Sequence, residues 1–300
     1  MLLQTPNEVQ LENLKKEEFY QPPEHVEEDV TQLIEWLSKQ PHLPNVTDRQ
    51  WLTNFIVGCK YNLQKAKKVI ESYFVVRSEL PKYFGSVSEE ELKEITKTGY
   101  ISLFPKLTPN GDRIFCIRTQ PTFNDVNFNV QLALKSGLSI LDLQLKEEPL
   151  SRNVFIFDLE YFQLSHFLSF TPQLAKHFIH CTVGSFPLRI EKVHFVNPPK
   201  FIGRLLNFIK LFLPTKIFER LIAHETFDTL HDYIPKDVLP ECYGGTGGSI
   251  EKIEESWIEF ILQNKEWLDK RPKADLSKCP VNVKTDDLGI NGTFKQLTFD

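Results

Sequence analysis

The sequence predicts an α/β protein in which a helical module precedes a domain of alternating strands and helices. Apolar residues recur at helical spacing between residues 25 and 97. After Gly99, short apolar runs that indicate strands alternate with longer helical patterns. The chain has 300 residues, of which 41% are hydrophobic and 25% charged, an ordinary balance for a globular protein.

Capping residues mark the helices of the first module. The first helix ends at Pro41, and Thr47 can cap the second. Asn62 can cap a third helix, and Ser88 with Glu91 forms a capping box for a fourth. We therefore expect four helices before residue 98.

Turn and strand signals mark the second part. Asn110-Gly111 predicts a hairpin between strands at Tyr100–Leu107 and Arg113–Thr119. The run 154–157 is short and apolar and ends at Asp158, as a buried strand does. We expect a further strand at 190–196 and helices at 125–146, 164–184 and 250–270.

The cysteine pattern and the chain's hydropathy indicate the cellular compartment of the protein. The five cysteines form no CxxC pair, and an odd number cannot pair fully within the chain, which favours a reducing compartment and argues against a zinc ribbon. The first 20 residues contain no signal-peptide apolar core. No run of about 18 apolar residues occurs. We expect a cytoplasmic protein without a cofactor.

Phenylalanine is unusually frequent, with 24 residues against one methionine. Two interpretations remain open: a Phe-rich core, or a cavity lined by aromatic side chains for a hydrophobic ligand.

Residues 199–213, PKFIGRLLNFIKLFL, form a helical pattern with a narrow polar stripe. Lys200, Arg204, Asn207 and Lys210 share that stripe, and almost every other residue is large and apolar. The segment is too short to span a bilayer. It is either a core helix or a mobile lid with one apolar side over a cavity and another that can contact lipid. The lid positions are Phe201, Ile202, Leu205 and Phe212.

Positive charge is concentrated around this segment. Between Phe186 and His224 there are seven Lys and Arg residues and two Glu residues, a net charge of +5 in a chain of net −5. A basic block in an acidic protein indicates an anionic partner surface. A phosphorylated lipid head group fits better than nucleic acid, because the cations alternate with aliphatic residues.

Three segments carry a resemblance to a known family. Residues 189–245, which end in LPECYGG, closely resemble the core of the CRAL-TRIO lipid-transfer family. VFIFDLEYFQLSH, 154–166, resembles its central strand and following turn, and residues 48–84 resemble its N-terminal helical module. The tail LGINGTFKQLTFD resembles the end of insect members.

The resemblance implies a mixed sheet that forms the floor of a hydrophobic pocket, with the helix at 199–213 as its lid. Matched position by position, it implies two sets of site residues. The pocket would be lined by Ser139, Phe157, Phe178, Cys181, Thr182, Phe186, Leu188, Ile190, Val193, Phe208, Ile209 and Leu213, with Ser136 or Ser139 as polar contacts. A phosphoinositide patch would comprise Arg189, Lys216 and Arg220.

Two positions depart from the family pattern at the basic patch. Cys59 stands where a relative has arginine, and Glu191 replaces another basic residue. Lys60 can compensate in part for Cys59.

With the resemblance, the chain divides into four parts. These are a flexible arm (1–24), the CRAL-TRIO N-terminal helical module (25–97), the CRAL-TRIO lipid-binding domain (98–271) and a C-terminal tail that packs back on the domain (272–300).

The expected function is the binding and transfer of a tocopherol, retinoid, carotenoid or similar lipid, with exchange at phosphoinositide-containing membranes. A lipid-sensing module that transfers no cargo is the alternative. We expect no enzymatic activity, because GGTGGS at 244–249 lacks the lysine of a P-loop and no GxSxG motif occurs.

Overall fold

The computed structural model describes residues 3–16, 20–125, 128–149 and 152–280. The tail sequence LGINGTFKQLTFD, together with most of the expected packing of residues 272–300, lies outside these residues.

The N-terminal helices follow the capping signals in the sequence. Asn62 caps α4 and Ser88 forms a capping box with Glu91 at α5, as predicted. The N-cap of α3 is Asp48 rather than Thr47, and its side chain accepts a hydrogen bond from the backbone N–H of Trp51. The elements are α1 (Glu8–Lys15), α2 (Pro23–Ser38), α3 (Arg49–Gly58), α4 (Leu63–Glu79), η1 (Pro81–Tyr83) and α5 (Glu89–Ile95).

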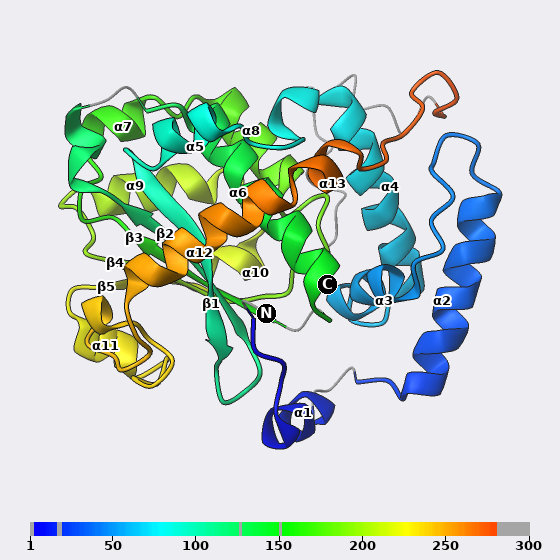
Figure 1. The fold of residues 1–300 in the computed structure, drawn as a ribbon, viewed down its shortest axis with the longest axis horizontal. Coiled ribbons are helices and arrows are strands. Elements are labelled where there is room, and N and C mark those ends of the chain that lie inside the picture. Colours follow the sequence, from blue (N-terminus) through cyan, green and yellow to red (C-terminus); the bar gives the residue numbers. More distant parts are fainter. Residues whose placement is uncertain (1–2, 17–19, 126–127, 150–151, 281–300) are drawn as a thin grey trace.

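Residues 3–16 contain a helix that the sequence analysis does not predict. They contain α1, which is capped by Asn7, and they lie along the β1–β2 hairpin (Figure 1). Leu3 is buried, and the backbone N–H of Gln4 donates to the carbonyl of Pro105. No residue of α1 is buried, so the helix carries no apolar stripe that the sequence could reveal.

A five-stranded mixed sheet forms the centre of the second part. The strands lie in the order β1-β2-β3-β4-β5, with β1 and β2 antiparallel and the other pairs parallel. The mixed sheet is confirmed, and only β5 is absent from the sequence prediction. The strands are β1 (Gly99–Leu107), β2 (Arg113–Thr119), β3 (Asn153–Asp158), β4 (Ile190–Val196) and β5 (Leu221–His224).

Helices cover the sheet, and α6 lies between it and the group α2, α3 and α4 (Figure 1). The remaining elements are η2 (Pro121–Asp125), α6 (Val130–Glu147), α7 (Leu164–Leu168), α8 (Pro172–Cys181), α9 (Ile202–Lys210), α10 (Thr215–Phe218), α11 (Phe227–His231), η3 (Glu241–Tyr243), α12 (Ile250–Gln263) and α13 (Lys265–Asp269).

The alternation of side chains along the strands creates two separate cores. Phe155 and Val193 point into the larger core, which also contains the helical module, α6 and parts of α8 and α9. Ile156 and Val196 point to the opposite face, where they pack with Tyr243 and the segment around α11. Alternate side chains of one strand therefore belong to two separate hydrophobic cores.

A buried carboxylate joins the two parts of the chain. Asp142 of α6 accepts hydrogen bonds from the guanidinium of Arg77 at 2.7 Å and from the hydroxyl of Tyr73 at 2.6 Å, both from α4. Arg271, just after α13, pairs with the same carboxylate. Burial lowers the pKa of Arg77 to about 10 and that of Arg271 to about 9, so both remain charged at neutral pH.

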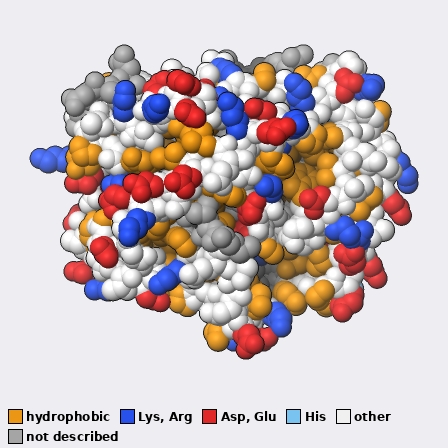
Figure 2. Space-filling model, viewed as in Figure 1, with side chains coloured by type: hydrophobic (Ala, Val, Ile, Leu, Met, Phe, Trp, Pro, Cys, Tyr) orange, Lys and Arg blue, Asp and Glu red, His pale blue; other side chains and the backbone are white. Residues whose placement is uncertain are grey.

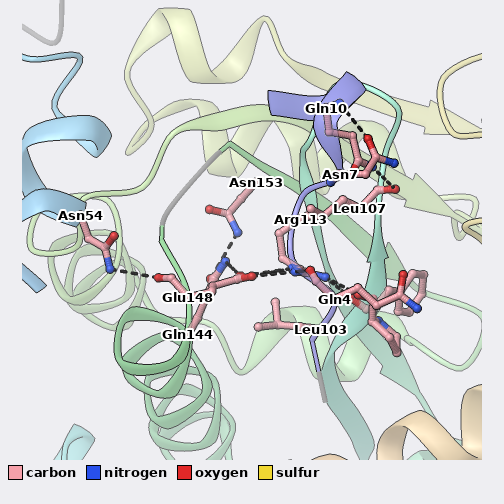
Figure 3. A network of polar contacts seen from close by, with 12 residues as sticks. Gln4, Asn7, Gln10, Asn54, Leu103, Leu107, Arg113, Gln144, Glu148 and Asn153 are labelled. Atoms are coloured by element: carbon pink, nitrogen blue, oxygen red, sulfur yellow. Dashed lines mark hydrogen bonds and ion pairs between the residues drawn. The ribbon is translucent and has the colours of Figure 1, made fainter. Parts of the chain in front are cut away.

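A second polar network ties the N-terminal segment to the sheet (Figure 3). The buried guanidinium of Arg113 donates to Glu148 at 2.6 Å and to the carbonyl of Gln4 at 2.8 Å. Asn54 of α3 donates to the carbonyl of Glu148 at 3.1 Å. One region at the end of α6 thus holds the N-terminal segment, the helical module and β2 together.

We expect Asp142→Ala to lower the free energy of unfolding by about 3–5 kcal/mol, because it leaves two buried guanidinium groups without their shared partner. Urea unfolding followed by circular dichroism measures this. Glu12→Ala is the control, since it removes only the exposed ion pair with Lys15 and should change little. Equal effects of the two substitutions would contradict the role of Asp142.

Candidate functional site

The face of the sheet that belongs to the larger core is incompletely covered near its middle. Phe157 lies on β3, the central strand, yet its side chain remains partly exposed and stacks on Phe195 of β4 at 5.4 Å between ring centroids. Phe178 of α8 and Ile209 of α9 pack against the same core and are also partly exposed. These three apolar side chains are therefore not completely buried.

The segment predicted as a lid has three distinct faces around α9. Ile202, Leu205, Leu206 and Ile209 pack on the larger core. Arg204 and the other residues of the predicted polar stripe are exposed. The regular helix is shorter than predicted, because residues 200–201 and 211–212 form turns at its ends.

A third face of the segment is aromatic and contacts α7. The ring of Phe167 lies 6.2 Å from that of Phe201 and 5.5 Å from that of Phe208, and Phe208 contacts Phe212 at 5.1 Å. Phe201 and Phe208 therefore face α7 rather than the centre of the sheet, and Phe212 packs on Phe208.

The predicted lining residues gather around the larger core, but to different degrees. Cys181, Phe186, Ile190 and Val193 are buried members of it. Phe186 also reaches the helical module, where its ring lies 5.4 Å from that of Tyr73. Leu188 packs partly buried against the same core, Thr182 donates to the carbonyl of Phe178, and Leu213 is half-buried at the end of the lid.

The two predicted serines differ in their hydrogen bonds. Ser139 is buried and donates to the carbonyls of Lys135 and Gly85, so its hydroxyl group is already engaged within the protein. Ser136 is equally buried, and its Oγ has no hydrogen-bond partner among the described residues. A buried hydroxyl without a partner costs free energy that a ligand can recover.

The predicted basic residues converge from distant parts of the chain. Burial and the positive charges of Arg189, Arg220, Lys65 and Lys216 lower the pKa of Lys60, which places the five cations near one another. We call these five residues the basic cluster. Lys65 was not predicted, although its position in the first turn after the α3–α4 loop is the signal that could have found it.

A close backbone contact brings the two halves of the basic cluster together. A side chain at Gly58 would place its Cβ 2.1 Å from the carbonyl oxygen of Pro187, so only glycine allows α3 to approach this closely. Lys60 and Tyr61 then adopt left-handed backbone conformations, with φ of 57° and 58°. Such strained non-glycine positions concentrate at functional sites.

Two hollows lie away from the predicted pocket. One of about 610 Å³ is bordered by Lys82, Glu94, Phe128 and His177 near the starts of α6 and α8. The other, of about 280 Å³, lies between the N-terminal segment and α12. Neither is lined by the residues predicted to hold the ligand. On the face drawn in Figure 2, acidic and basic side chains are mixed.

Family models match both parts of the chain. Residues 97–245 match the model described as the CRAL/TRIO domain. The chain contains a CRAL/TRIO domain. Residues 22–87 match a second model, described as a Pinta-like UBA domain. The CRAL/TRIO match covers the sheet, the lid and the segment that ends in Tyr-Gly-Gly, and the resemblance seen in the sequence is confirmed.

Several proteins are similar to this chain along most of its length. A mouse (Mus musculus) protein named alpha-tocopherol transfer protein-like is 29% identical over 256 residues, which are 84% of this chain and 74% of that protein. Clavesin-1 of Xenopus laevis is 26% identical, over 76% of this chain and 70% of its own. A solved structure titled "Crystal structure of Sfh5" aligns with a TM-score of 0.48 and 14% identity, over 88% of this chain and 99% of that chain.

Proteins with a CRAL/TRIO domain typically bind or transfer lipids. No helix among the described residues of this one is long and apolar enough to cross a bilayer.

A histidine pair joins the two strands of the CRAL/TRIO sheet that flank the lid. His194 Nδ1 of β4 lies 2.7 Å from His224 Nε2 of β5, and His224 Nδ1 lies 2.9 Å from the hydroxyl of Thr229. Thr229 donates its proton to the carbonyl of Thr226, so it accepts from His224 Nδ1, and His224 Nε2 accepts from His194. Both rings are neutral in this arrangement.

Burial, together with the charges of His224 and Lys192, lowers the pKa of His194 to about 3. Burial also lowers the pKa of His224, against the opposing effect of Asp232. Because the folded pKa values lie below the unfolded value, the unfolded chain takes up protons first as the pH falls. The contribution of His194 to stability is fully present above about pH 6.5 and is lost progressively as the pH falls toward 3, and that of His224 is lost in the same direction.

We expect the free energy of unfolding of His194→Gln/His224→Gln to depend less steeply on pH between 7 and 4 than that of the parent protein. Each histidine contributes up to about 1.4 kcal/mol per pH unit in this range. Urea unfolding at several pH values measures the slopes, and His25→Gln, at an exposed position, is the control. Parallel slopes for all three proteins would exclude the pair as a source of acid sensitivity.

Proposed function

We propose that this protein binds a small hydrophobic ligand between its sheet and α9 and exchanges it at an anionic membrane surface. The observation that carries the proposal is the position of the lid. It packs on one side against the larger core, and it leads directly into α10, which carries a residue of the basic cluster. Lys210, at the end of α9, lies over the ring of Phe218 at 5.2 Å and joins the two helices.

The lining supports a largely apolar cargo with one polar contact. Phe157, Phe178 and Ile209 offer accessible apolar surface, and an apolar ligand there removes that surface from water. Ser136 supplies a buried hydroxyl group that has no partner among the described residues. A lipid with a single hydroxyl or carbonyl group, such as a tocopherol, a retinoid or a carotenoid, matches this combination.

Exposed leucines near the lid support contact with a bilayer. Leu168 of α7 is 72% exposed, and Leu211, directly after α9, is 76% exposed. The ring contact of Phe167 with Phe208 connects these two segments. Large apolar side chains exposed beside cations are typical of proteins that insert shallowly into the interface of a membrane.

The basic cluster supports recognition of a phosphorylated lipid head group. Its members come from the helical module, the residue before β4, α10 and the residue before β5, and like charges held together in a folded protein favour an anionic ligand. Glu191, which departs from the family pattern, lies 3.7 Å from Arg152, and this pairing offsets part of its negative charge. The name of the mouse relative, alpha-tocopherol transfer protein-like, agrees with a carrier function.

Replacing Arg189, Lys216 and Arg220 with Ala should weaken binding to vesicles that contain phosphatidylinositol bisphosphate. Each cation near an anionic leaflet contributes about 1 kcal/mol, so the triple variant should lose roughly two orders of magnitude in affinity. Added salt should weaken binding of the parent protein and have less effect on the variant. Vesicle co-sedimentation measures both.

The matched control removes three exposed lysines elsewhere, Lys39, Lys252 and Lys273, and changes the net charge by the same amount. Equal losses in the two triple variants would show that binding depends on net charge alone.

Leu211→Asp should slow transfer of a fluorescent nitrobenzoxadiazole-labelled tocopherol from the protein to vesicles without lowering the melting temperature. The side chain is already exposed in water, so the substitution removes apolar contact only at the membrane. Stopped-flow fluorescence measures the transfer rate. Val9→Asp, at a similarly exposed position on α1, is the control. Unchanged transfer in Leu211→Asp would argue against insertion of this segment, and a protein that binds the probe but never transfers it would be a sensor.

A further inference from the structure

The lid begins at a residue in a strained backbone conformation. Asn197 has a φ of +49°, and among the described residues only Lys60 and Tyr61 are other non-glycine positions with positive φ. Asn197 follows the last residue of β4 and precedes Pro198-Pro199. A residue is retained in this region of φ when the surrounding structure holds it there.

The side chain of Asn197 is held by a buried carboxylate. Its Nδ2 donates to Asp158 Oδ1 at 2.9 Å, and the backbone N–H of Glu160 donates to the same oxygen at 3.2 Å. The hydroxyl of Tyr243 donates to Asp158 Oδ2 at 3.1 Å. Asp158 is 4% exposed, so these hydrogen bonds form away from water, where they are strong.

Asp158 itself is fixed by the ends of three strands. Its carbonyl accepts a hydrogen bond from the hydroxyl of Thr119, at the end of β2, at 3.0 Å. The next residue, Leu159, donates its backbone N–H to the carbonyl of Val196, the last residue of β4, at 3.0 Å. The carboxylate that accepts the hydrogen bond from Asn197 therefore lies at the end of the central strand rather than in a loop.

We propose that Asp158 is a positioning residue for the lid: held by Tyr243, it keeps Asn197 in its left-handed conformation, and the lid opens when the Asn197–Asp158 hydrogen bond breaks. The inference rests on the proposed function only in that the lid must open to exchange cargo. It also gives the tyrosine of the LPECYGG segment a role, because that segment carries Tyr243 to the other side of the carboxylate.

Substitutions of Asn197 can test its side-chain hydrogen bond to Asp158 separately from its left-handed backbone conformation. Glycine adopts positive φ without a steric penalty, so Asn197→Gly removes the hydrogen bond and leaves the turn accessible. Asn197→Asp also tolerates the left-handed region but places a second carboxylate beside Asp158. The exchange Asn197→Asp/Asp158→Asn restores one donor and one acceptor at this contact.

The test measures amide hydrogen exchange of residues 200–213 in the ligand-free full chain, with residues 30–37 of α2 as the internal reference. Loss of a hydrogen bond to a charged acceptor should make the lid amides of Asn197→Gly exchange about tenfold faster. Exchange in Asn197→Asp should be faster still, and the double exchange variant should return toward the parent rate. The reference amides should be unchanged.

Two further variants distinguish the hydrogen bonds of Tyr243 and Asn197 to Asp158 from general packing effects. Tyr243→Phe removes the hydroxyl that holds Asp158 and should accelerate lid exchange. The same hydroxyl also contacts Cys116 Sγ at 3.6 Å, so Cys116→Ala is the matched control, and it should leave lid exchange as in the parent. Lid exchange that is unchanged in both Asn197→Gly and Asn197→Asp would overturn the inference. Faster exchange that the double variant does not reverse would also overturn it.

Transfer of the labelled tocopherol to vesicles distinguishes this inference from the proposed function. If Asn197→Gly accelerates both lid exchange and transfer, the inference holds and the lid is the gate. If lid exchange accelerates while transfer stays constant, Asp158 still positions the lid, but the proposed route of cargo exchange fails. If the variants do not fold, Tyr243→Phe gives the same readout without altering the strained residue.

Discussion

The two-part architecture depends on one buried carboxylate that is shared by two guanidinium groups. Asp142 lies on α6, whereas Arg77 belongs to the helical module and Arg271 to the segment after α13. Burying three charges is unfavourable unless their geometry is complete, so all three elements must dock together or not at all. The helical module is therefore an integral part of the folded unit that contains the CRAL/TRIO domain, and its position relative to α6 is set by a contact that tolerates little displacement.

That fixed position has a direct effect on the site. The guanidinium of Arg77 lies 3.2 Å from the ring centre of Tyr73 and 5.2 Å from that of Phe186, a predicted lining residue. Gly58 also allows α3 to touch Pro187, two residues before Arg189 of the basic cluster. A site assembled from a helical module and a sheet requires such contacts, because neither part contains all of its residues.

The sequence was sufficient where local rules decide the structure and insufficient where distant segments meet. Asn62 and Ser88 begin helices as predicted because a cap acts within one turn. β5 was missed because four residues, Leu221–His224, are too few to show alternation. The convergence of Lys65 on Arg189, the orphaned hydroxyl of Ser136 and the aromatic contact of the lid with α7 depend on tertiary packing. Periodicity within one segment contains no information about such contacts.

The lid is also the crossover connection between two neighbouring parallel strands. β4 leads into it after Val196, and β5 begins at Leu221, which pairs with Val193. The connection therefore leaves the C-terminal end of β4 and enters the N-terminal end of β5, and these two strands are about 4.8 Å apart. If the lid opens as proposed, a connection attached in this way can rotate about an axis that runs along the strands. Such a rotation leaves the hydrogen bonds of the sheet intact, so access to the interior does not require the fold to loosen.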